Sequence, residues 1–449
     1  MSENERLVVG VDIGTTKICA VVASADEHGR IHVRGVGVAD SHGLNRGVVV
    51  NIDKTVAAVQ EAVAEAERAA GVSVESVVVG IAGDHIQSFQ SRGVITVSGG
   101  EISKQDVARL LEDTRHVAMP ADREILHVIP QEFIVDGQDG VADPVGMSGV
   151  RLEANVHIIT GLVSAAKNVY RCIEKAGYRV DDIVLEPLAS SYAVLHDDEK
   201  EVGVVLVDIG GGTTDIAIFE DKTIRHTAVI AVAGNKVTDD IRKGLGVLHD
   251  QAEQLKRQFG SALVDLVDVE QQITIPGIGG RPEKAISQST LASIIQPRIE
   301  EILEIVAIEV KRSGYARHLS AGVVLTGGGS LIMGTAELAA DILGLESRIG
   351  RPLGLEGGLA KEVASPKYAT GVGLVLHALR EGIGSGASMI PTPVFPAVPA
   401  SGDGSGDGAG DGHLAAEPQL SPSYEPEYED GDSLVAKITD RMKRWFDEL

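Results

Sequence analysis

The sequence predicts an α/β protein built on at least two sheets. Segments typical of strands and helices alternate along roughly residues 5–383. One short phrase, an apolar strand that ends in Asp-Ile-Gly and continues into Gly and Thr, occurs at residues 8–22 and again at residues 204–219. A third apolar strand, within residues 321–334, also runs into three glycines. Two copies of one strand–turn phrase indicate an internal duplication.

The individual elements follow from hydrophobic periodicity and from turn residues. Strands are expected at residues 7–11, 18–22, 76–81, 94–97, 125–135, 152–159 and 319–325. Residues 202–219 read as a strand, a glycine turn and a second strand. Helices are expected at residues 52–70, 103–117 and 290–310, the first of them ending at Gly71.

Composition limits the classes of function. The 449 residues suggest about two to four domains, and aromatic residues make up only 3%, so the core must consist of Val, Ile, Leu and Ala. The formal charge of −25 argues against a nucleic-acid partner. Two cysteines, Cys19 and Cys172, fit a reducing compartment and no disulfide framework.

The composition changes at about residue 384. Residues 384–432 are rich in Gly, Ser, Pro and acids, and residues 400–432 contain no Lys or Arg. Such a stretch buries too little apolar surface to offset the entropy of ordering it, so we expect a disordered acidic linker. A surface loop that packs on the body is the alternative.

Residues 433–449 have the pattern of an amphipathic helix with an apolar face and a basic edge. An isolated helix of this length is marginal in water and needs a surface to lie on. An anionic membrane surface suits its Trp and Phe, and docking on protein is the alternative. The residues expected to touch the membrane are Leu434, Ile438, Met442, Trp445, Phe446 and Leu449.

The repeated phrase has a chemical interpretation. Glycine lets the backbone approach a ligand closely, and the amides and Thr hydroxyls of such a hairpin can bind phosphate oxygens. Asp12 and Asp208 end their strands beside these groups, where they could hold a hydrated Mg²⁺ or cap the glycine turn. Two facing hairpins would clamp a nucleotide, and the third glycine run could accept its purine and ribose. Neither a Walker A sequence nor a dinucleotide fingerprint occurs in the proper context.

These segments resemble a known superfamily. VDIGTTK, VDIGGGTTD and VVLTGGGS are similar to the phosphate 1, phosphate 2 and adenosine motifs of the actin, Hsp70 and sugar-kinase ATPases. LEPLASSYAVL and ASPKYATGVGLVL resemble its two connecting helices. The resemblance implies an actin-like fold, with two RNase H-like domains around a cleft that holds ATP and Mg²⁺.

Further phrases narrow the resemblance to the FtsA family of bacterial division proteins. They are HGLNRGVVVNIDKT, VIPQEFIVDG and DPVGMSGVRLEANVHIITG. The family implies an inserted subdomain in place of the usual actin subdomain, and it implies that the terminal helix targets the membrane. An MreB-like scaffold or a pilus-assembly ATPase is the alternative. A sugar kinase would need a substrate pocket and a catalytic Asp that the sequence does not suggest.

The resemblance assigns roles residue by residue. Glu186 takes the position of a residue that orients the attacking water, although it could equally be an N-cap before Pro187. Asp12 and Asp208 would hold Mg²⁺ through water. The nucleotide contacts would be Gly14, Thr15, Thr16, Lys17, Gly210, Gly211, Gly212, Thr213, Gly234, Asn235, Glu253, Lys256, Gly327, Gly328 and Gly329. For Lys17 the alternative is a solvated strand-edge lysine, and for Glu253 and Lys256 it is an i,i+3 surface ion pair.

The family resemblance also implies partners and a location. Such a protein would polymerise, bind the FtsZ C-terminal tail and anchor the FtsZ ring to the cytoplasmic side of the cell membrane at the septum. It would help recruit other division proteins and would be at most a slow ATPase. Arg298 and Arg312 sit at basic positions matching the tail-docking helix, although they could be ordinary exposed arginines.

The expected organisation has eight segments. The first actin-like domain takes residues 1–82 and 163–200, and the inserted subdomain lies between them at 83–162. The second domain takes residues 201–236 and 306–383, with its small, FtsZ-docking lobe at 237–305. The linker at 384–432 and the amphipathic helix at 433–449 complete the chain.

Overall fold

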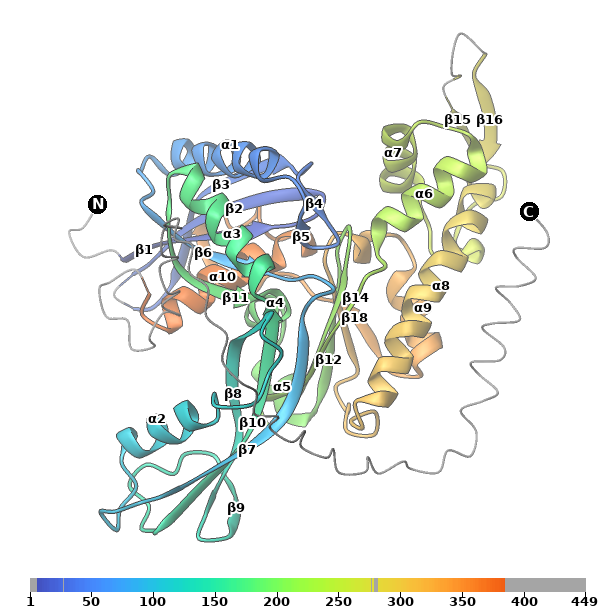
Figure 1. Ribbon diagram of the computed structural model, residues 1–449. Coiled ribbons are helices and arrows are strands. Elements are labelled where there is room, and N and C mark those ends of the chain that lie inside the picture. The colour runs from blue at the N-terminus through green and yellow to red at the C-terminus, as the bar shows by residue number, and fades with distance from the viewer. Residues whose placement is uncertain (1–5, 27, 276, 278–281, 384–449) are drawn as a thin grey trace, which may run out of the picture. The chain divides into compact units, whose positions relative to one another are not determined.

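The computed structural model describes residues 6–26, 28–275, 277 and 282–383 (Figure 1). The linker and the membrane helix expected at residues 384–449 lie outside the described residues and stay predictions. Within the described part of the chain, no helix combines the length and the apolarity needed to span a bilayer.

The first large sheet has six strands in the order β11-β6-β1-β2-β3-β19. Their bounds are β11 Arg179–Leu185, β6 Ser76–Ile81, β1 Arg6–Ile13, β2 Lys17–Ala25, β3 Ile31–Asp40 and β19 Leu355–Gly358. Helices α1 (Ile52–Ala70) and α3 (Val163–Ala176) pack on one face, and α10 (Ala369–Arg380) packs on the other (Figure 1). Asn51 caps the start of α1 through its side chain, which the sequence interpretation did not name, and Gly71 ends the helix in the left-handed conformation, as the sequence predicts.

The second large sheet has five strands in the order β14-β13-β12-β17-β18. Their bounds are β14 Thr223–Ile230, β13 Thr214–Glu220, β12 Val204–Ile209, β17 Val323–Thr326 and β18 Ser347–Ile349. On one face lies an apolar core with α6 (Gly234–Leu245), α8 (Gln288–Arg312) and α9 (Thr335–Leu343). On the other face lie α4 (Glu186–Val194) and α10, which belong to a core shared with the first sheet, and α5 (Asp197–Val202) contacts β13.

The two sheets repeat one topology. Each has an antiparallel three-stranded meander, β1-β2-β3 or β12-β13-β14, whose first strand pairs in parallel with a later strand. The hairpins also match in register, since Asp12 pairs with Cys19 and Asp208 pairs with Asp215. The duplicated phrase therefore occupies the same place in both sheets.

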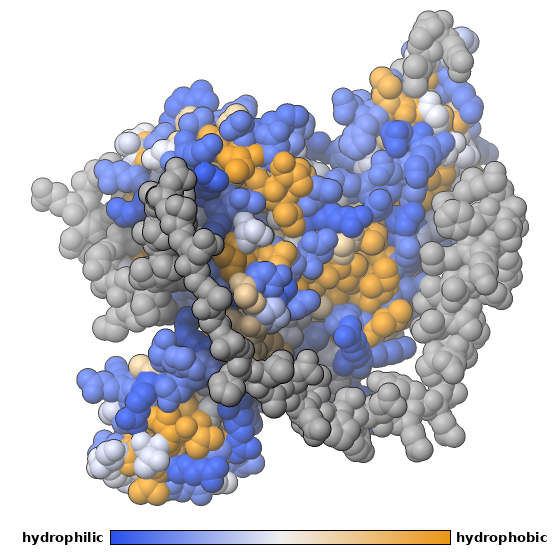
Figure 2. Space-filling view, in the orientation of Figure 1, coloured by the Kyte–Doolittle hydropathy of each residue, from blue (hydrophilic) through white to orange (hydrophobic). Residues whose placement is uncertain are grey.

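An inserted unit follows β6. Its sheet has the order β7-β10-β8-β9, with bounds Gln87–Thr96, Arg151–Leu162, Arg123–Val135 and Gln138–Val141. Helix α2 (Lys104–Asp113) completes a separate apolar core with this sheet. Figure 2 shows that hydrophilic residues cover much of the described surface on that side, with apolar patches between them, one of them on this inserted unit.

A small lobe is inserted in the second half. It contains α6, α7 (His249–Phe259), the hairpin of β15 (Gln272–Ile275) and β16 (Lys284–Ser287), and most of α8. The remaining short elements are β4 (Leu44–Asn45), β5 (Val48–Val49) and the 3₁₀ turns at Val264–Leu266, Gly329–Leu331 and Pro366–Tyr368. The segment ends proposed at residues 200, 236 and 305 fall inside α5, α6 and α8, so none of them marks a break between elements.

The helix at 52–70 and the strand at 76–81 are confirmed to the residue. The helix expected at 103–117 is shorter, since α2 ends at Asp113 and the Thr114 hydroxyl donates to the Leu111 carbonyl there. The strand expected at 319–325 begins only at Val323, because the chain turns at Gly322 with a φ of 74°. There a Cβ would meet the Glu346 carbonyl oxygen at 2.1 Å.

Candidate functional site

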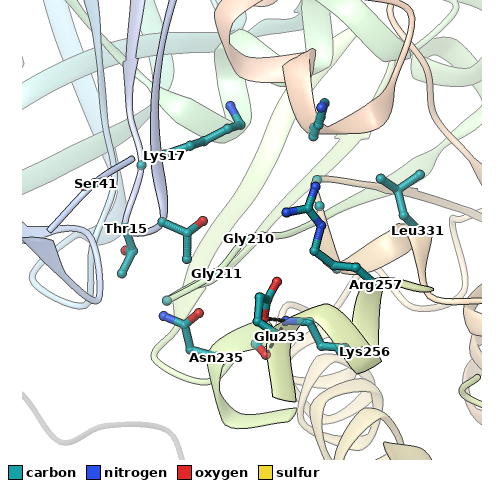
Figure 3. A pocket seen from close by; sticks show the side chains of 18 of the residues that line it. Thr15, Lys17, Ser41, Gly210, Gly211, Asn235, Glu253, Lys256, Arg257 and Leu331 are labelled. Carbon is teal, nitrogen blue, oxygen red and sulfur yellow. Dashed lines mark hydrogen bonds and ion pairs between the residues drawn. The ribbon is translucent and has the colours of Figure 1, made fainter. Parts of the chain in front are cut away.

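The two glycine hairpins both line a cavity of about 1390 Å³ (Figure 3). It is lined by the turns of β1–β2 and β12–β13, by the N-terminal ends of α4 and α6, by α7 and by the glycine run after β17. Every nucleotide, metal and catalytic residue assigned from the sequence is among the lining residues. Segments more than 300 residues apart in sequence, such as those of Asp12 and Gly327, thus converge on one space.

The tips of the two hairpins touch. A Cβ added to Gly211 would lie 2.3 Å from Thr16 Cγ2, and one added to Gly212 would lie 2.5 Å from Thr15 Oγ1. Side chains at these two glycines would therefore separate the hairpins. The first amides of α6 are tied to the same turn, because Gly234 N donates to Gly210 O and Asn235 N donates to Gly211 O at 2.8 Å.

The third glycine run is equally close to the second hairpin. Gly327 has a φ of 81°, and its Cβ would lie 2.3 Å from Asp208 Oδ1. A Cβ on Gly329 would lie 2.4 Å from Ile209 Cγ2. Bare backbone therefore forms this wall of the cavity, as the sequence predicts for a surface that receives a flat ligand.

Asp208 lies at the end of β12 and is buried. Its Oδ2 accepts hydrogen bonds from Ser190 Oγ at 2.8 Å and from Thr370 Oγ1 at 3.5 Å, which come from α4 and α10. Burial raises the pKa of Asp208 to about 6, despite the hydrogen bond from Ser190. The carboxyl group is thus held in place by both connecting helices.

Asp215 is a further buried carboxyl that the sequence interpretation left without a role, although it closes the repeated phrase. Thr213 Oγ1 donates to its Oδ2 at 3.0 Å, whereas Oδ1 has no hydrogen-bond partner among the described residues. Burial, and then the charge of Asp208, raises the pKa of Asp215 to about 8. Burial and the nearby charges of Asp12 and Asp215 also raise the pKa of Glu186 well above its ordinary value.

Lys17 is the cation closest to this group of acids. Its Nζ lies 3.1 Å from Asp12 Oδ2, and its side chain is only 22% exposed, so it is not a solvated strand-edge lysine. Burial lowers the pKa of Lys17, but the charges of Asp12, Cys19 and Tyr368 and the hydrogen bond to Asp12 together raise it by more, so the net shift is upward. One lysine cannot neutralise four carboxyl groups, so the site suits an added cation.

The acids of this cavity can be compared with the ligands that a divalent ion requires. Within the described ranges, no three His, Cys, Asp or Glu side chains come close enough together to ligate a metal directly. Mg²⁺ commonly keeps several waters and is held by one or two carboxylates and by substrate phosphates. The raised pKa values of Asp208 and Asp215 and the unpaired Oδ1 fit a hydrated ion held in this way.

Glu186 opens α4, but it does not cap it. Leu185 is the N-cap residue, and the helix start has no side-chain cap hydrogen bond. The N-cap interpretation of Glu186 is therefore wrong. Its side chain packs against Gly80, where a Cβ would lie 2.9 Å from Glu186 Cγ, and it lines the cavity.

Glu253 and Lys256 of α7 do form the i,i+3 ion pair, with 2.6 Å between Oε2 and Nζ. Both also line the cavity, so the ion pair and a ligand contact are compatible. Lys256 Nζ further donates to Gly234 O at 3.0 Å and to Thr238 Oγ1 at 2.8 Å. The lysine thus fixes the start of α6 beside the hairpin.

Arg298 and Arg312 lie on α8, away from the residues that line this cavity. Arg298 is 21% exposed and pairs with Asp240 of α6 at 2.6 Å and with Glu301. Arg312 is 79% exposed and lies 3.6 Å from Glu309. The two arginines are fourteen residues apart along the helix, which is about 21 Å, so they cannot both contact one small group.

Several lining residues carried no signal that the sequence interpretation used. Arg257 of α7 extends its side chain into the pocket, as Figure 3 shows, and follows directly after Lys256. Lys367 lies in the second connecting segment, where its Nζ is 4.8 Å from the Tyr368 ring centre. Ser41 belongs to the loop after β3, which has neither glycine repeats nor an acid–turn pattern like the hairpins.

Comparison with protein families gives two matches. The family model described as cell division protein FtsA matches residues 205–373. The model described as the SHS2 domain inserted in FtsA matches residues 83–160, which is the part of the chain that forms the inserted sheet and α2.

Curated relatives match most of the chain. It is 45% identical to cell division protein FtsA of Pseudomonas aeruginosa over 379 residues, which cover 84% of this chain and 91% of that protein. It is 39% identical to cell division protein FtsA of Escherichia coli K12, with coverage of 83% and 90%. The protein of the same name in Bacillus subtilis is 39% identical, with 84% of each chain covered.

Solved structures share the fold at low sequence identity. A PilM-PilN type IV pilus biogenesis complex matches with a TM-score of 0.61 and 16% identity, covering 83% of this chain and 98% of that one. MreB 5 of Spiroplasma citri bound to AMPPNP matches with a TM-score of 0.51 and 18% identity, covering 85% and 99%. The actin-like architecture expected from the sequence is confirmed.

Proposed function

Because the chain belongs to the FtsA family of cell division proteins, we propose that it is an ATP-binding, actin-like scaffold that links the division ring to the membrane. The observation that carries the nucleotide part of this proposal is the cavity between the two glycine hairpins, with buried acids at its base. The membrane and FtsZ parts are supported by family membership and by the sequence pattern of residues 433–449.

We infer one orientation for ATP in the cavity. The bare backbone of Gly327, Gly328 and Gly329 would receive the adenosine, while the two hairpins would hold the phosphates with their amides and Thr hydroxyls. The actin-like relative MreB 5 of Spiroplasma citri has been solved with AMPPNP bound, which supports a nucleotide in this fold. Lys17 would supply a point charge to the phosphates.

Mg²⁺ would be held through water by Asp12 and Asp208, with Asp215 next to them. When bound, the ion would neutralise phosphate charge and would let the buried carboxyl groups ionise. Glu186 could orient or deprotonate a water only in its ionised form, and its surroundings favour the neutral form. We therefore expect at most slow hydrolysis.

The scaffold part of the proposal has three contacts. The protein would self-associate into actin-like filaments, capture the FtsZ C-terminal tail on the lobe that contains α8, and lie on the inner face of the membrane through residues 433–449. Other division proteins would join through this assembly. The fold likeness to the PilM-PilN complex is at 16% identity and does not favour a pilus-assembly role.

Calorimetry with Mg·ATP tests the central claim. The parent protein should bind Mg·ATP, and Gly211→Val should weaken binding strongly, because its side chain would force apart the two hairpins that hold the phosphates. A useful control is Gly29→Val. Gly29 lies in the β2–β3 turn, where no atom of the described residues is within 4 Å of an added Cβ, although its φ of 76° means that the control must be checked for folding. Absence of Mg·ATP binding by the parent would refute the nucleotide proposal.

A further inference from the structure

The loop between β3 and α1, residues 40–47, is a third element at the phosphate end of the cavity. It contributes Asp40, Ser41, His42 and Gly47 to the lining. Two of its amides hold the first hairpin, since Ser41 N donates to Thr16 O and Gly47 N donates to Thr15 Oγ1, both at 3.1 Å. The loop therefore touches the hairpin at both of its threonines.

Among the described residues, the Ser41 hydroxyl is the polar side-chain group of this loop that is buried and left without a hydrogen bond. Ser41 is 7% exposed, and its Oγ has no hydrogen-bond partner among the described residues. Burying a hydroxyl without a hydrogen bond is unfavourable. A ligand oxygen in the adjoining cavity would remove that cost.

The loop is rigid enough to position a hydroxyl. Val50 N and Asn51 N both donate to Gly43 O, at 2.9 and 3.0 Å, and Asn51 caps the start of α1. Gly43 fits tightly, because a Cβ there would lie 2.2 Å from Thr55 Oγ1. The loop is therefore fastened to the first turn of α1 on one side and to the hairpin on the other.

The position of Ser41 indicates which part of a nucleotide it would meet. In Figure 3, Ser41 and Thr15 lie on one side of the pocket, and Leu331 and Arg257 lie on the other. Leu331 follows the glycine run to which the proposed function assigns the adenosine. Ser41 is thus at the end of the cavity away from the adenosine, where the last phosphate of a triphosphate would reach.

We propose that Ser41 is a positioning residue for the terminal phosphate, to which its hydroxyl donates a hydrogen bond that a nucleoside diphosphate cannot receive. This inference rests on the proposed nucleotide function and assigns a residue outside the two hairpins and the glycine run. It makes loop 40–47 the part of the first domain that distinguishes a triphosphate from a diphosphate. Loop 40–47 also abuts the start of the inserted unit, since a Cβ on Gly47 would lie 2.8 Å from Gly83 Cα.

Calorimetry on the full chain tests this with Mg·AMPPNP and Mg·ADP. A hydrogen bond to a charged phosphate contributes substantially to binding affinity. Ser41→Ala and the near-isosteric Ser41→Cys should therefore each weaken AMPPNP binding roughly 10- to 100-fold. Their affinity for Mg·ADP should stay within about twofold of the parent. Ser24→Ala is the matched control, because Ser24 is equally buried but accepts from Arg34 Nε at 2.9 Å and lies outside the cavity lining.

The melting temperature without nucleotide separates this role from a structural one. Removing a hydroxyl that has no partner should leave the nucleotide-free melting temperature of Ser41→Ala unchanged or higher, whereas a structural serine would lower it. Unchanged AMPPNP affinity, or equal losses for AMPPNP and ADP, would overturn the assignment of Ser41. A parent protein that binds neither nucleotide would overturn the proposed function itself.

Discussion

Replacing Asp215 with Asn should stabilise the nucleotide-free protein at high pH and not at low pH. The pKa of this carboxyl is raised from 3.8 to about 8, chiefly by burial. A raised acid pKa means that the folded state holds a proton that the unfolded state releases between these two values. Stability is therefore lost as pH rises from about 4 to about 8, and it levels off above that.

The magnitude follows from the size of the shift. At about 1.4 kcal/mol per pKa unit, Asp215 costs the fold at most about 6 kcal/mol above pH 8, where it is ionised, and roughly 2 kcal/mol at pH 5, where the folded state must keep it protonated. Asn keeps an acceptor for the Thr213 hydroxyl, but its amide hydrogens meet the place where Oδ1 has no partner, at a cost of about 1–3 kcal/mol. Asp215→Asn should thus gain about 3 kcal/mol at pH 8.5 and close to nothing at pH 5.

Urea denaturation followed by far-UV circular dichroism measures this difference. Tryptophan fluorescence is unsuitable, because the single tryptophan, Trp445, lies outside the described residues. Asp341→Asn on α9 is the control, since it makes the same chemical change at an exposed position. The raised pKa of Asp215 would be refuted if Asp215→Asn is no more stable than the parent at pH 8.5, or if the difference in unfolding free energy between the two proteins is the same at both pH values.

Three further outcomes are expected. Glu186→Gln should keep Mg·ATP affinity within about threefold but should abolish any slow phosphate release, measured by a phosphate-binding assay; unchanged release would exclude Glu186 from hydrolysis. Arg312→Ala should weaken capture of an FtsZ tail peptide by about 1.5–3 kcal/mol if the exposed guanidinium meets a carboxylate, whereas Arg298→Ala should also lower the melting temperature because it breaks the pair with Asp240; peptide affinities within twofold of the parent would contradict the docking site. Trp445→Glu should release the protein from anionic vesicles, with added salt weakening the parent only in part; flotation of Trp445→Glu with liposomes would indicate that the helix binds protein instead.

The sequence was sufficient for the framework of the site because the chemistry lies in local phrases. Asp-Ile-Gly followed by Gly and Thr marks both the end of a strand and the start of a tight turn, so the residues and their backbone geometry are predicted together. Helix α1 was predicted to the residue from its helical periodicity and from Gly71 at its end, which are sequence-local signals. In each of these cases the relevant contacts are made within a few residues.

The features that the sequence did not show depend on contacts between distant segments. Ser190 and Thr370 reach Asp208 from two helices that only the fold brings together. The same is true of Ser41, whose side chain is notable only because the surrounding loop buries it without a partner. Arg298 was assigned to the peptide-docking helix with an exposed arginine as the alternative, and neither interpretation included Asp240, 58 residues away, which binds it. Pairings of this kind have no sequence period to reveal them.

The two hairpins share one geometry but not one chemistry, and this asymmetry accounts for the design of the site. From Asp12 to Cys19 and from Asp208 to Asp215 the registers coincide, so Lys17 takes the place of Thr213 and Cys19 takes the place of Asp215. The first hairpin thereby brings a cation, paired at 3.1 Å with its own aspartate, and the second brings a buried second acid. A symmetric pair with two lysines would reduce the excess of acids over lysines from three to one and so weaken the hold on a hydrated cation, and a pair with two extra acids would repel the phosphates. The different residues at these two paired positions give the duplicated turns different roles, with one side of the site suited to phosphate and the other to a metal ion.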